Sequence, residues 1–273
     1  MFITVITDCA DANARGRQET RIRTLFDVTP SFVPVSGALD VAASLEASGN
    51  IVDMLDAAGE APGIILANVA PRQGGERHWG NGTPFGFFRY KHVLVCTTVS
   101  GAMLSLPRKL GLIERYDILN LPETLERMVA EGALDADRKE SIARSQFRSF
   151  DFLPRVAHYV HAGGAPVAHE HFLDMEAPSE PHVWTIDNFG NAKTTMLARE
   201  LPDADSLATR WGALPIVRSL KDVPDGSPAL TVGSSGIGHE RFVEVVIQGA
   251  SMADQYGVSV GDPVMAHAQP ASS

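Results

Sequence analysis

Two short runs of almost uninterrupted apolar residues constrain the fold of this chain more than any other feature. They are residues 63–69 (GIILANV) and 92–99 (HVLVCTTV). Runs of this length and composition are typical of strands that are covered on both faces, as in a parallel sheet. Residues 2–7 have the same character and predict a first strand at the N-terminus.

Helical signals separate and follow these runs. Residues 36–49 carry apolar side chains on one helical face, with Ser36 and Gly49 as the expected ends. Pro122 begins one further helix and the segment DADRKES another, each with carboxylates in the first turn, where the helix dipole favours them. Strands that alternate with helices predict an α/β N-terminal domain with a mostly parallel sheet.

The pattern changes after about residue 165. Residues 165–182 (APVAHEHFLDMEAPSEPH) are rich in proline and read as a linker. The β-type runs beyond it, bounded by turn residues, are 182–186, 192–197, 214–220 and 242–248. Short strands at this spacing predict a small all-β, barrel-like C-terminal domain. We therefore expect two domains, residues 1–172 and 173–273.

Composition excludes several classes of partner. A net charge of -10 argues against nucleic acid, since phosphate contacts require a surplus of Lys and Arg. No apolar run approaches the about 20 residues that span a bilayer. The N-terminus reads as a strand and not as a secretion signal, and Cys9 and Cys96 suit a reducing compartment, so we expect a cytoplasmic protein without disulfides.

Four polar residues follow the predicted strands. Asp8 ends the first strand, Asn68 ends the second, Arg77 lies in the glycine-rich loop after it, and Ser100 follows the third. Ligands of open parallel sheets bind beyond the carboxyl ends of the strands, so these residues are expected at one rim. Asp8 either accepts hydrogen bonds from a ribose diol or caps a turn. Arg77 either binds an anion or orients water, or it is a solvated surface residue.

Two features imitate known motifs. His158 and His161 share a predicted helix and His169 and His171 flank a predicted linker, but no cysteine pair or HExxH accompanies them, so we expect solvated or helix-end histidines and no metal. Residues 233–238 (GSSGIG) resemble a phosphate loop. They lead into a β-type run instead of a helix, which favours a β-turn loop.

Three stretches together resemble the S-adenosylmethionine hydroxide adenosyltransferases, relatives of the fluorinase and chlorinase enzymes. The first is ITD at residues 6–8, and the second is IDNFGN at 186–191, followed by two threonines. The third begins with GSSG at 233–236 and ends with ASMA at 250–253 and GVSVGD at 257–262. The resemblance runs along most of the chain and is strongest after residue 182.

This resemblance implies an α/β domain followed by a β-barrel, assembled into a homotrimer whose ligand lies between the domains of neighbouring subunits. The ligand is S-adenosylmethionine, with no metal or separate cofactor. Carried over by motif, Asp8 holds the ribose hydroxyls, Asp187 the methionine ammonium and Asn191 the adenine edge. The remaining substrate-binding residues are Ser234 and Ser235 at the carboxylate end, Ser251, Met252 and Ala253 along the adenine slot, and Ser100 and Phe189.

The sequence departs from the family where water would be activated. The family's DPGVGTxRR loop is here residues 68–77, with Asn68 in place of the aspartate and two extra residues before Arg77. The PDNG turn is TVSG at 98–101, and the HGRDxFxP segment, at 147–154, lacks its histidine. Asn68 cannot act as a base, so Arg77, helped by His78, is the expected group that positions water, and Asn68 completes the expected catalytic set.

Three functions are compatible with these observations. The first is a divergent S-adenosylmethionine hydrolase that attacks C5′ with water to give adenosine and methionine. The second is a non-catalytic protein of the same fold that binds S-adenosylmethionine or adenosine. The third, an α/β protein with an unrelated small-molecule pocket, requires that the C-terminal motif match is accidental.

Overall fold

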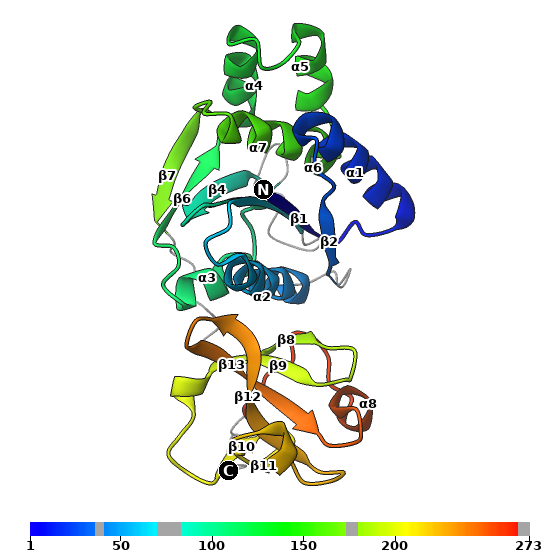
Figure 1. The fold of residues 1–273 in the computed structure, drawn as a ribbon, viewed down its shortest axis with the longest axis vertical. Coiled ribbons are helices and arrows are strands. Elements are labelled where there is room, and N and C mark those ends of the chain that lie inside the picture. Colours follow the sequence, from blue (N-terminus) through cyan, green and yellow to red (C-terminus); the bar gives the residue numbers. More distant parts are fainter. Residues whose placement is uncertain (36–40, 70–82, 173–179, 267–273) are drawn as a thin grey trace, which may run out of the picture. The chain divides into compact units, whose positions relative to one another are not determined.

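The computed structural model describes residues 1–35, 41–69, 83–172 and 180–266 of the chain. They belong to two compact units, Met1–Met175 and Glu176–Ser273, each with its own sheets (Figure 1). The boundary expected between residues 172 and 173 borders on a segment outside the described residues, and its position stays a prediction.

A seven-stranded sheet forms the centre of the first unit, in the order β2-β1-β3-β5-β4-β6-β7. The strands β2, β1, β3 and β5 pair in parallel, whereas β4, β6 and β7 pair with their neighbours in antiparallel fashion. Their bounds are β1 Phe2–Thr7, β2 Ser31–Pro34, β3 Gly63–Asn68, β4 Phe85–Tyr90, β5 Val93–Thr98, β6 Arg115–Leu119 and β7 Ala168–Phe172. The predicted α/β domain with a mostly parallel sheet is confirmed, and all six residues of both β3 and β5 are buried, as their apolar sequences require.

Helices cover both faces of this sheet. Figure 1 shows α2 and α3 on one face and α1, α6 and α7 on the other, with α4 and α5 beyond α7. The bounds are α1 Ala12–Phe26, α2 Val41–Ala58, α3 Ser105–Lys109, α4 Leu121–Ala130, α5 Ala136–Ala143, α6 Arg148–Asp151 and α7 Leu153–His161. The hydroxyl groups of Ser44 and Ser48 in α2 accept hydrogen bonds from the backbone N–H groups of Ala102 (2.9 Å) and Leu106 (3.0 Å), which ties the chain after β5 to this helix.

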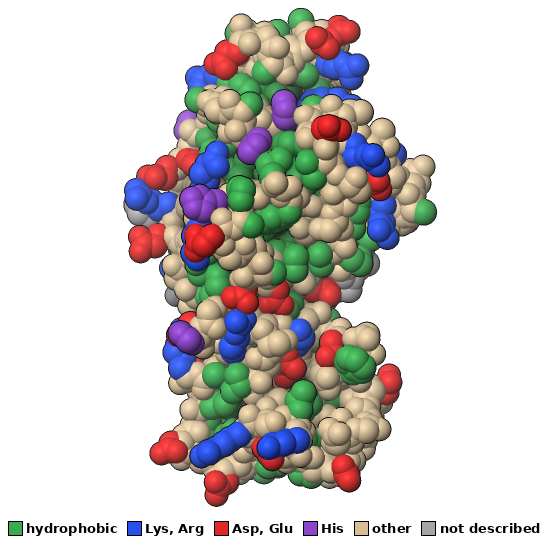
Figure 2. Space-filling model, in the orientation of Figure 1, with side chains coloured by type: hydrophobic (Ala, Val, Ile, Leu, Met, Phe, Trp, Pro, Cys, Tyr) green, Lys and Arg blue, Asp and Glu red, His purple; other side chains and the backbone are tan. Residues whose placement is uncertain are grey.

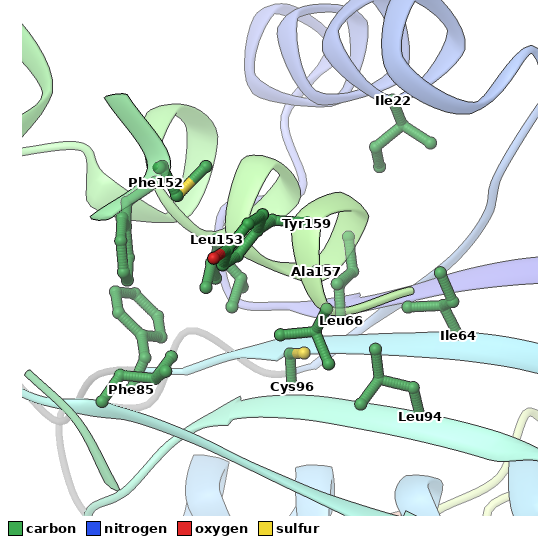
Figure 3. Close-up of a cluster of buried hydrophobic side chains, with 14 of the residues drawn as sticks. Ile22, Ile64, Leu66, Phe85, Leu94, Cys96, Phe152, Leu153, Ala157 and Tyr159 are labelled. Carbon is green, nitrogen blue, oxygen red and sulfur yellow. The ribbon is translucent and has the colours of Figure 1, made fainter. Parts of the chain in front are cut away.

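The main apolar core of the first unit lies between the sheet and α7 (Figure 3). Leu66 of β3 and Cys96 of β5 point toward α7, where Ala157 packs against them, and the Phe85 and Phe152 rings meet at 6.0 Å. Complete burial raises the pKa of the Cys96 thiol to about 12, because desolvation penalises the thiolate. Cys96 is therefore a structural, uncharged thiol.

Two expectations for the first unit need correction, and one helix was not predicted. The helix expected to end at Gly49 continues to Ala58, because its apolar face continues past the glycine through the buried Ile51, Val52 and Leu55. The long helix α1 has few apolar residues and carried no clear periodic signal. Residues 168–172, assigned to a linker, form the edge strand β7, which pairs with β6 along its whole length.

The second unit is built from short antiparallel strands. One sheet has the order β12-β13-β9-β8, and β10 and β11 form a separate hairpin. The bounds are β8 Val183–Ile186, β9 Ala192–Leu197, β10 Ser206–Thr209, β11 Gly212–Pro215, β12 Pro228–Ile237, β13 Glu240–Ile247 and α8 Met252–Tyr256. Met196, Val243, Val245 and Met252 are among the buried side chains of its core. The predicted all-β C-terminal region is confirmed.

Two predictions within this unit were wrong. The run 214–220 is a strand only as far as Pro215, the end of β11, and it ends in a 3-10 helix, Leu220–Asp222. Residues 233–237, expected in a turn loop, belong to the long strand β12, which contains an irregularity between Val232 and Gly236. The tight turn that joins β12 to β13 comes only at residues 238–239.

Basic and acidic side chains are mixed on the surface. On the face shown in Figure 2, basic side chains are scattered among acidic ones and form no continuous stripe of the kind that binds nucleic acid. No helix within the described ranges is long and apolar enough to cross a membrane.

Candidate functional site

The carboxyl ends of β1, β3 and β5 lie side by side in the first unit. Thr7 is in register with Asn68, and the preceding residue of β3, Ala67, is in register with Thr97. The backbone N–H of Asp8 donates to the carbonyl of Asn68 at 3.4 Å. Asp8 and Asn68 therefore stand at one rim of the sheet, as the parallel topology predicts.

The turn after β1 fixes the position of Asp8. The hydroxyl of Thr7 accepts a hydrogen bond from the N–H of Cys9 at 3.0 Å, and the buried amide of Gln18 in α1 donates to the carbonyl of Cys9 at 3.3 Å. Asp11 caps α1 by accepting from the N–H groups of the second and third residues that follow it. Asp8, half-buried, thus lies between a buried strand and a capped helix.

A buried hydroxyl joins the ends of β3 and β5. The Thr98 hydroxyl donates to the carbonyl of Val69 at 2.7 Å and accepts from its N–H at 3.3 Å. Ser100 follows two residues later and is half-buried. The Asn68 side chain is buried beside this link, at 8% exposure. Arg77 and His78, the expected catalytic pair, lie outside the described residues.

The turn between β8 and β9 is organised by one carboxylate. Asp187 Oδ1 accepts from the N–H groups of Phe189 and Asn191, both at 2.9 Å, and Oδ2 accepts from the Asn191 side-chain amide at 3.0 Å. A carboxylate has about four acceptor sites, so among the described residues roughly one stays available on Oδ2 after these three bonds. The turn holds Phe189 outward, with 71% of this residue exposed.

The same turn packs directly on the start of α8. Gly190 has φ +81°, and a Cβ atom there would lie 2.0 Å from the Ser251 hydroxyl oxygen. The Gly190 carbonyl accepts from the Ala253 N–H at 3.0 Å, and the Ser251 hydroxyl caps α8 by accepting from the Asp254 N–H at 3.0 Å. Glycine is required here by both backbone conformation and space.

A cavity of about 450 Å³ opens beside this turn within the second unit. Phe189, Asn191 and Ala250 line it together with Leu220 and Gln248. Its volume falls within the range of small-molecule pockets. Leu220 and Gln248 were not predicted, because they come from two segments that only the folded unit brings to the turn.

Other predicted binding residues lie on different faces. Ser234 is exposed, whereas Ser235 is buried and its hydroxyl contacts the Lys193 ammonium at 2.7 Å, because successive strand residues point to opposite sides. Met252 is fully buried in the core of the unit, so only its backbone stands beside Ser251 and Ala253. The roles assigned to these residues stay predictions.

The four histidines considered as metal ligands are separated by the fold. His158 and His161, on α7, both pack against Phe26, whereas His169 and His171, on β7, point to the same side of the edge strand. His171 stacks on Tyr116 of the neighbouring strand. Within the described ranges, no three His, Cys, Asp or Glu side chains converge on a common point.

Comparison with known proteins gives a family match within the second unit. Residues 181–265 match the model of the SAM hydroxide adenosyltransferase C-terminal domain. A stretch of 92 residues is 33% identical to the (R)-S-adenosyl-L-methionine hydrolase of Thermus thermophilus, and covers 34% of this chain. The chain matches about a third of the length of this curated relative (33%).

The whole fold recurs in solved structures. An uncharacterized conserved protein from Thermotoga maritima has a TM-score of 0.63 at 15% identity, covering 97% of this chain and 99% of its own. A conserved hypothetical protein from Thermus thermophilus has a TM-score of 0.59 at 18% identity, covering 97% and 98%. At these identities the likeness concerns the fold alone.

The chain therefore combines an α/β N-terminal region with an all-β C-terminal region that matches the SAM hydroxide adenosyltransferase C-terminal domain. The two sequence matches support a divergent member of the S-adenosylmethionine hydrolase and fluorinase-like family.

Proposed function

We propose that this protein hydrolyses S-adenosylmethionine to adenosine and methionine. The observation that carries the proposal is the β8–β9 turn, in which the family's DxFGN residues present an exposed aromatic ring beside a cavity of about 450 Å³. The match of residues 181–265 to the family domain supports the same ligand class.

The proposed reaction is a displacement at C5′ of the ribose. A water oxygen forms a bond to C5′ while the C5′–S bond breaks, and its electron pair returns to the sulfonium sulfur, which becomes the neutral thioether of methionine. The proton of the attacking water leaves to solvent. The protein must hold the water in line with the breaking bond and exclude other water.

Each binding group has a defined part in this proposal. The remaining acceptor site of Asp187 takes the methionine ammonium, and the exposed Phe189 ring stacks on the adenine face. Asp8 accepts two hydrogen bonds from the ribose diol at the rim of the first unit. We include in the proposal a homotrimer whose ligand is shared by neighbouring subunits.

A second candidate is a protein that binds S-adenosylmethionine or adenosine without turnover. The observation in its favour is Asn68, which is buried at the end of β3, where the resemblance predicts an aspartate. An amide brings no charge and takes no proton at neutral pH, so it cannot help to ionise a water.

The two candidates are separated by one assay. Purified protein is incubated with S-adenosylmethionine, and adenosine and methionine are followed by chromatography for the wild type, Arg77→Ala and Asn68→Asp. We expect slow turnover that Arg77→Ala abolishes and Asn68→Asp increases, by about tenfold or more for a restored proton acceptor.

Binding of S-adenosylmethionine, measured by calorimetry, is the companion readout. Asp8→Asn should weaken it by about 1.5–3 kcal/mol, the scale of hydrogen bonds to charged groups. Binding without product in the wild type and in Asn68→Asp would establish the non-catalytic protein, whereas neither binding nor product would reject both candidates.

A further inference from the structure

Three arginines surround a second cavity, away from the strand ends. This cavity has a volume of about 250 Å³ and is lined by Arg21 of α1, Arg138 of α5, Arg155 and His158 of α7, and the turn 132–135. Figure 1 shows α1, α5 and α7 on the same side of the sheet. A concentration of positive charge at this place contrasts with the chain's net charge of -10.

The nearby carboxylates compensate these arginines only in part. Arg21 and Arg155 share Asp151, whose Oδ1 lies 3.4 Å from Arg21 and 4.0 Å from Arg155. The other oxygen of Asp151 accepts from the Ser145 hydroxyl at 2.8 Å. Arg138 pairs with the exposed Asp135, at 3.6 Å. In the part of the chain that the structure describes, three guanidinium groups therefore face two carboxylates.

Among the described residues, these arginines also have hydrogen-bond donors without an acceptor. Arg21 Nε is buried and has no hydrogen-bond partner among the described residues. Arg155 is only 8% exposed, and its hydrogen bond goes to a backbone carbonyl, that of Asp151. Burial and the charges of Arg21 and Arg138 lower the pKa of Arg155, although its guanidinium stays protonated at neutral pH. A buried, partly compensated cation of this kind is stabilised by an anion.

We propose that this cavity binds a phosphate group, as inorganic phosphate or as part of a small phosphorylated molecule. The three guanidinium groups lie on three different helices and donate from different directions. Such donors suit the several oxygens of a tetrahedral anion better than the two oxygens of a carboxylate. The volume of about 250 Å³ lies below that of usual pockets for drug-sized ligands, which favours a small ligand over a nucleotide.

The phosphate site is separate from the proposed nucleoside site. Arg21 lies ten residues beyond Asp11, the cap of α1, and a helix rises about 1.5 Å per residue, which places it about 15 Å along the axis from the strand-end rim. Phosphate binding is therefore independent of whether S-adenosylmethionine is the substrate.

The test is calorimetric titration of the full-length protein with sodium phosphate at constant ionic strength, with glycerol 3-phosphate and succinate as further probes. Arg138→Gln removes one guanidinium from an exposed position and should weaken phosphate binding about tenfold or more, the loss expected for a hydrogen bond to a charged group. Arg144→Gln, at the end of α5 and paired with Glu140, is the matched control and should bind as the wild type does.

A second variant tests the site without removing any of its side-chain contacts. Ala133→Glu adds a carboxylate at an exposed position of the lining turn, removes no side-chain hydrogen bond, and should abolish phosphate binding with the circular dichroism spectrum unchanged. Absence of phosphate binding to the wild type, equal losses in Arg138→Gln and Arg144→Gln, or succinate binding as tight as that of phosphate would each overturn the proposal. Tighter binding of glycerol 3-phosphate than of phosphate would support it and assign the site to a phosphorylated metabolite.

Discussion

The two units hold their candidate binding residues in different ways. In the second unit the Asp187 carboxylate makes three hydrogen bonds inside the β8–β9 turn, and Gly190 packs without space against Ser251. In the first unit the strand ends are joined by backbone groups and by the Thr98 hydroxyl, while Asp8 and Asn68 lie at the rim where the parallel strands end.

This difference predicts that substitutions have unequal effects on stability in the two units. Asp187 and Gly190 hold the DNFGN turn together and pack it on Ser251, so a substitution there costs stability directly. Asn68 stands at the end of β3, where backbone groups make the pairing with β1.

The largest effect is expected for Gly190→Ala. An alanine at φ +81° is strained, and its Cβ would collide with Ser251, so we expect a loss of about 3 kcal/mol or more of unfolding free energy. Urea denaturation followed by the fluorescence of Trp184 and Trp211, both in the second unit, measures it. Gly226→Ala, at φ +66° with no atom within 4 Å of the added Cβ, is the control and should lose only about 1 kcal/mol. Equal losses would show that packing against Ser251 is not essential.

A moderate effect is expected for Thr98→Val in the first unit. The change keeps the shape of the side chain but leaves the N–H and carbonyl of Val69 without their buried partner, so stability should fall by about 1–2 kcal/mol. Thr98→Ser keeps the hydroxyl and should recover part of that loss. Denaturation monitored by hydrogen exchange of β3 and β5 is the measurement, and a loss as large as that of Gly190→Ala would remove the contrast between the units.

The smallest effect concerns pH at the antiparallel edge of the first unit. Burial raises the pKa of Asp117, and the charge of Glu170, opposite it on β7, raises it further. The contribution of Asp117 to stability is therefore fully present below the unfolded-state pKa of 3.8 and is lost as pH rises through the higher folded-state pKa.

Asp117→Asn should remove this loss. We expect the free energy of unfolding to rise by about a few tenths of a kcal/mol at pH 7 and not to change at pH 3, and the gain is small because the group is only partly buried. Denaturation at both pH values is the measurement, and Asp203→Asn, on the exposed surface, is the control. A gain that is equal at both pH values would assign the effect to packing and not to charge.

Much of the first unit follows from its sequence because buried parallel strands have a distinctive composition. The strands β1, β3 and β5 could be assigned from their apolar sequence runs alone. The arginine-rich α1 could not be found by periodicity, since its buried positions include the polar Gln18 as well as Ala14 and Ile22. The edge strand β7 has alternating polar residues, and only its pairing with β6 distinguishes it from a linker.

The candidate site was predictable where topology alone decides the geometry. Asp8 and Asn68 meet because the ends of parallel strands share one rim. The opposite orientations of Ser234 and Ser235 were missed because a glycine- and serine-rich run reads as a turn, whereas pairing with β13 makes it a strand. The proposed phosphate cavity is lined by residues from segments far apart in the sequence, so no local sequence pattern predicts it.

The inert state of Cys96 has a practical consequence. Of the two cysteines in the chain, Cys96 is completely buried and its raised pKa of about 12 keeps the thiol protonated at neutral pH, while Cys9 is half-buried and lies next to Asp8. A maleimide dye therefore labels Cys9 selectively in the folded protein. Its emission would report on events at the strand-end rim without any engineered residue.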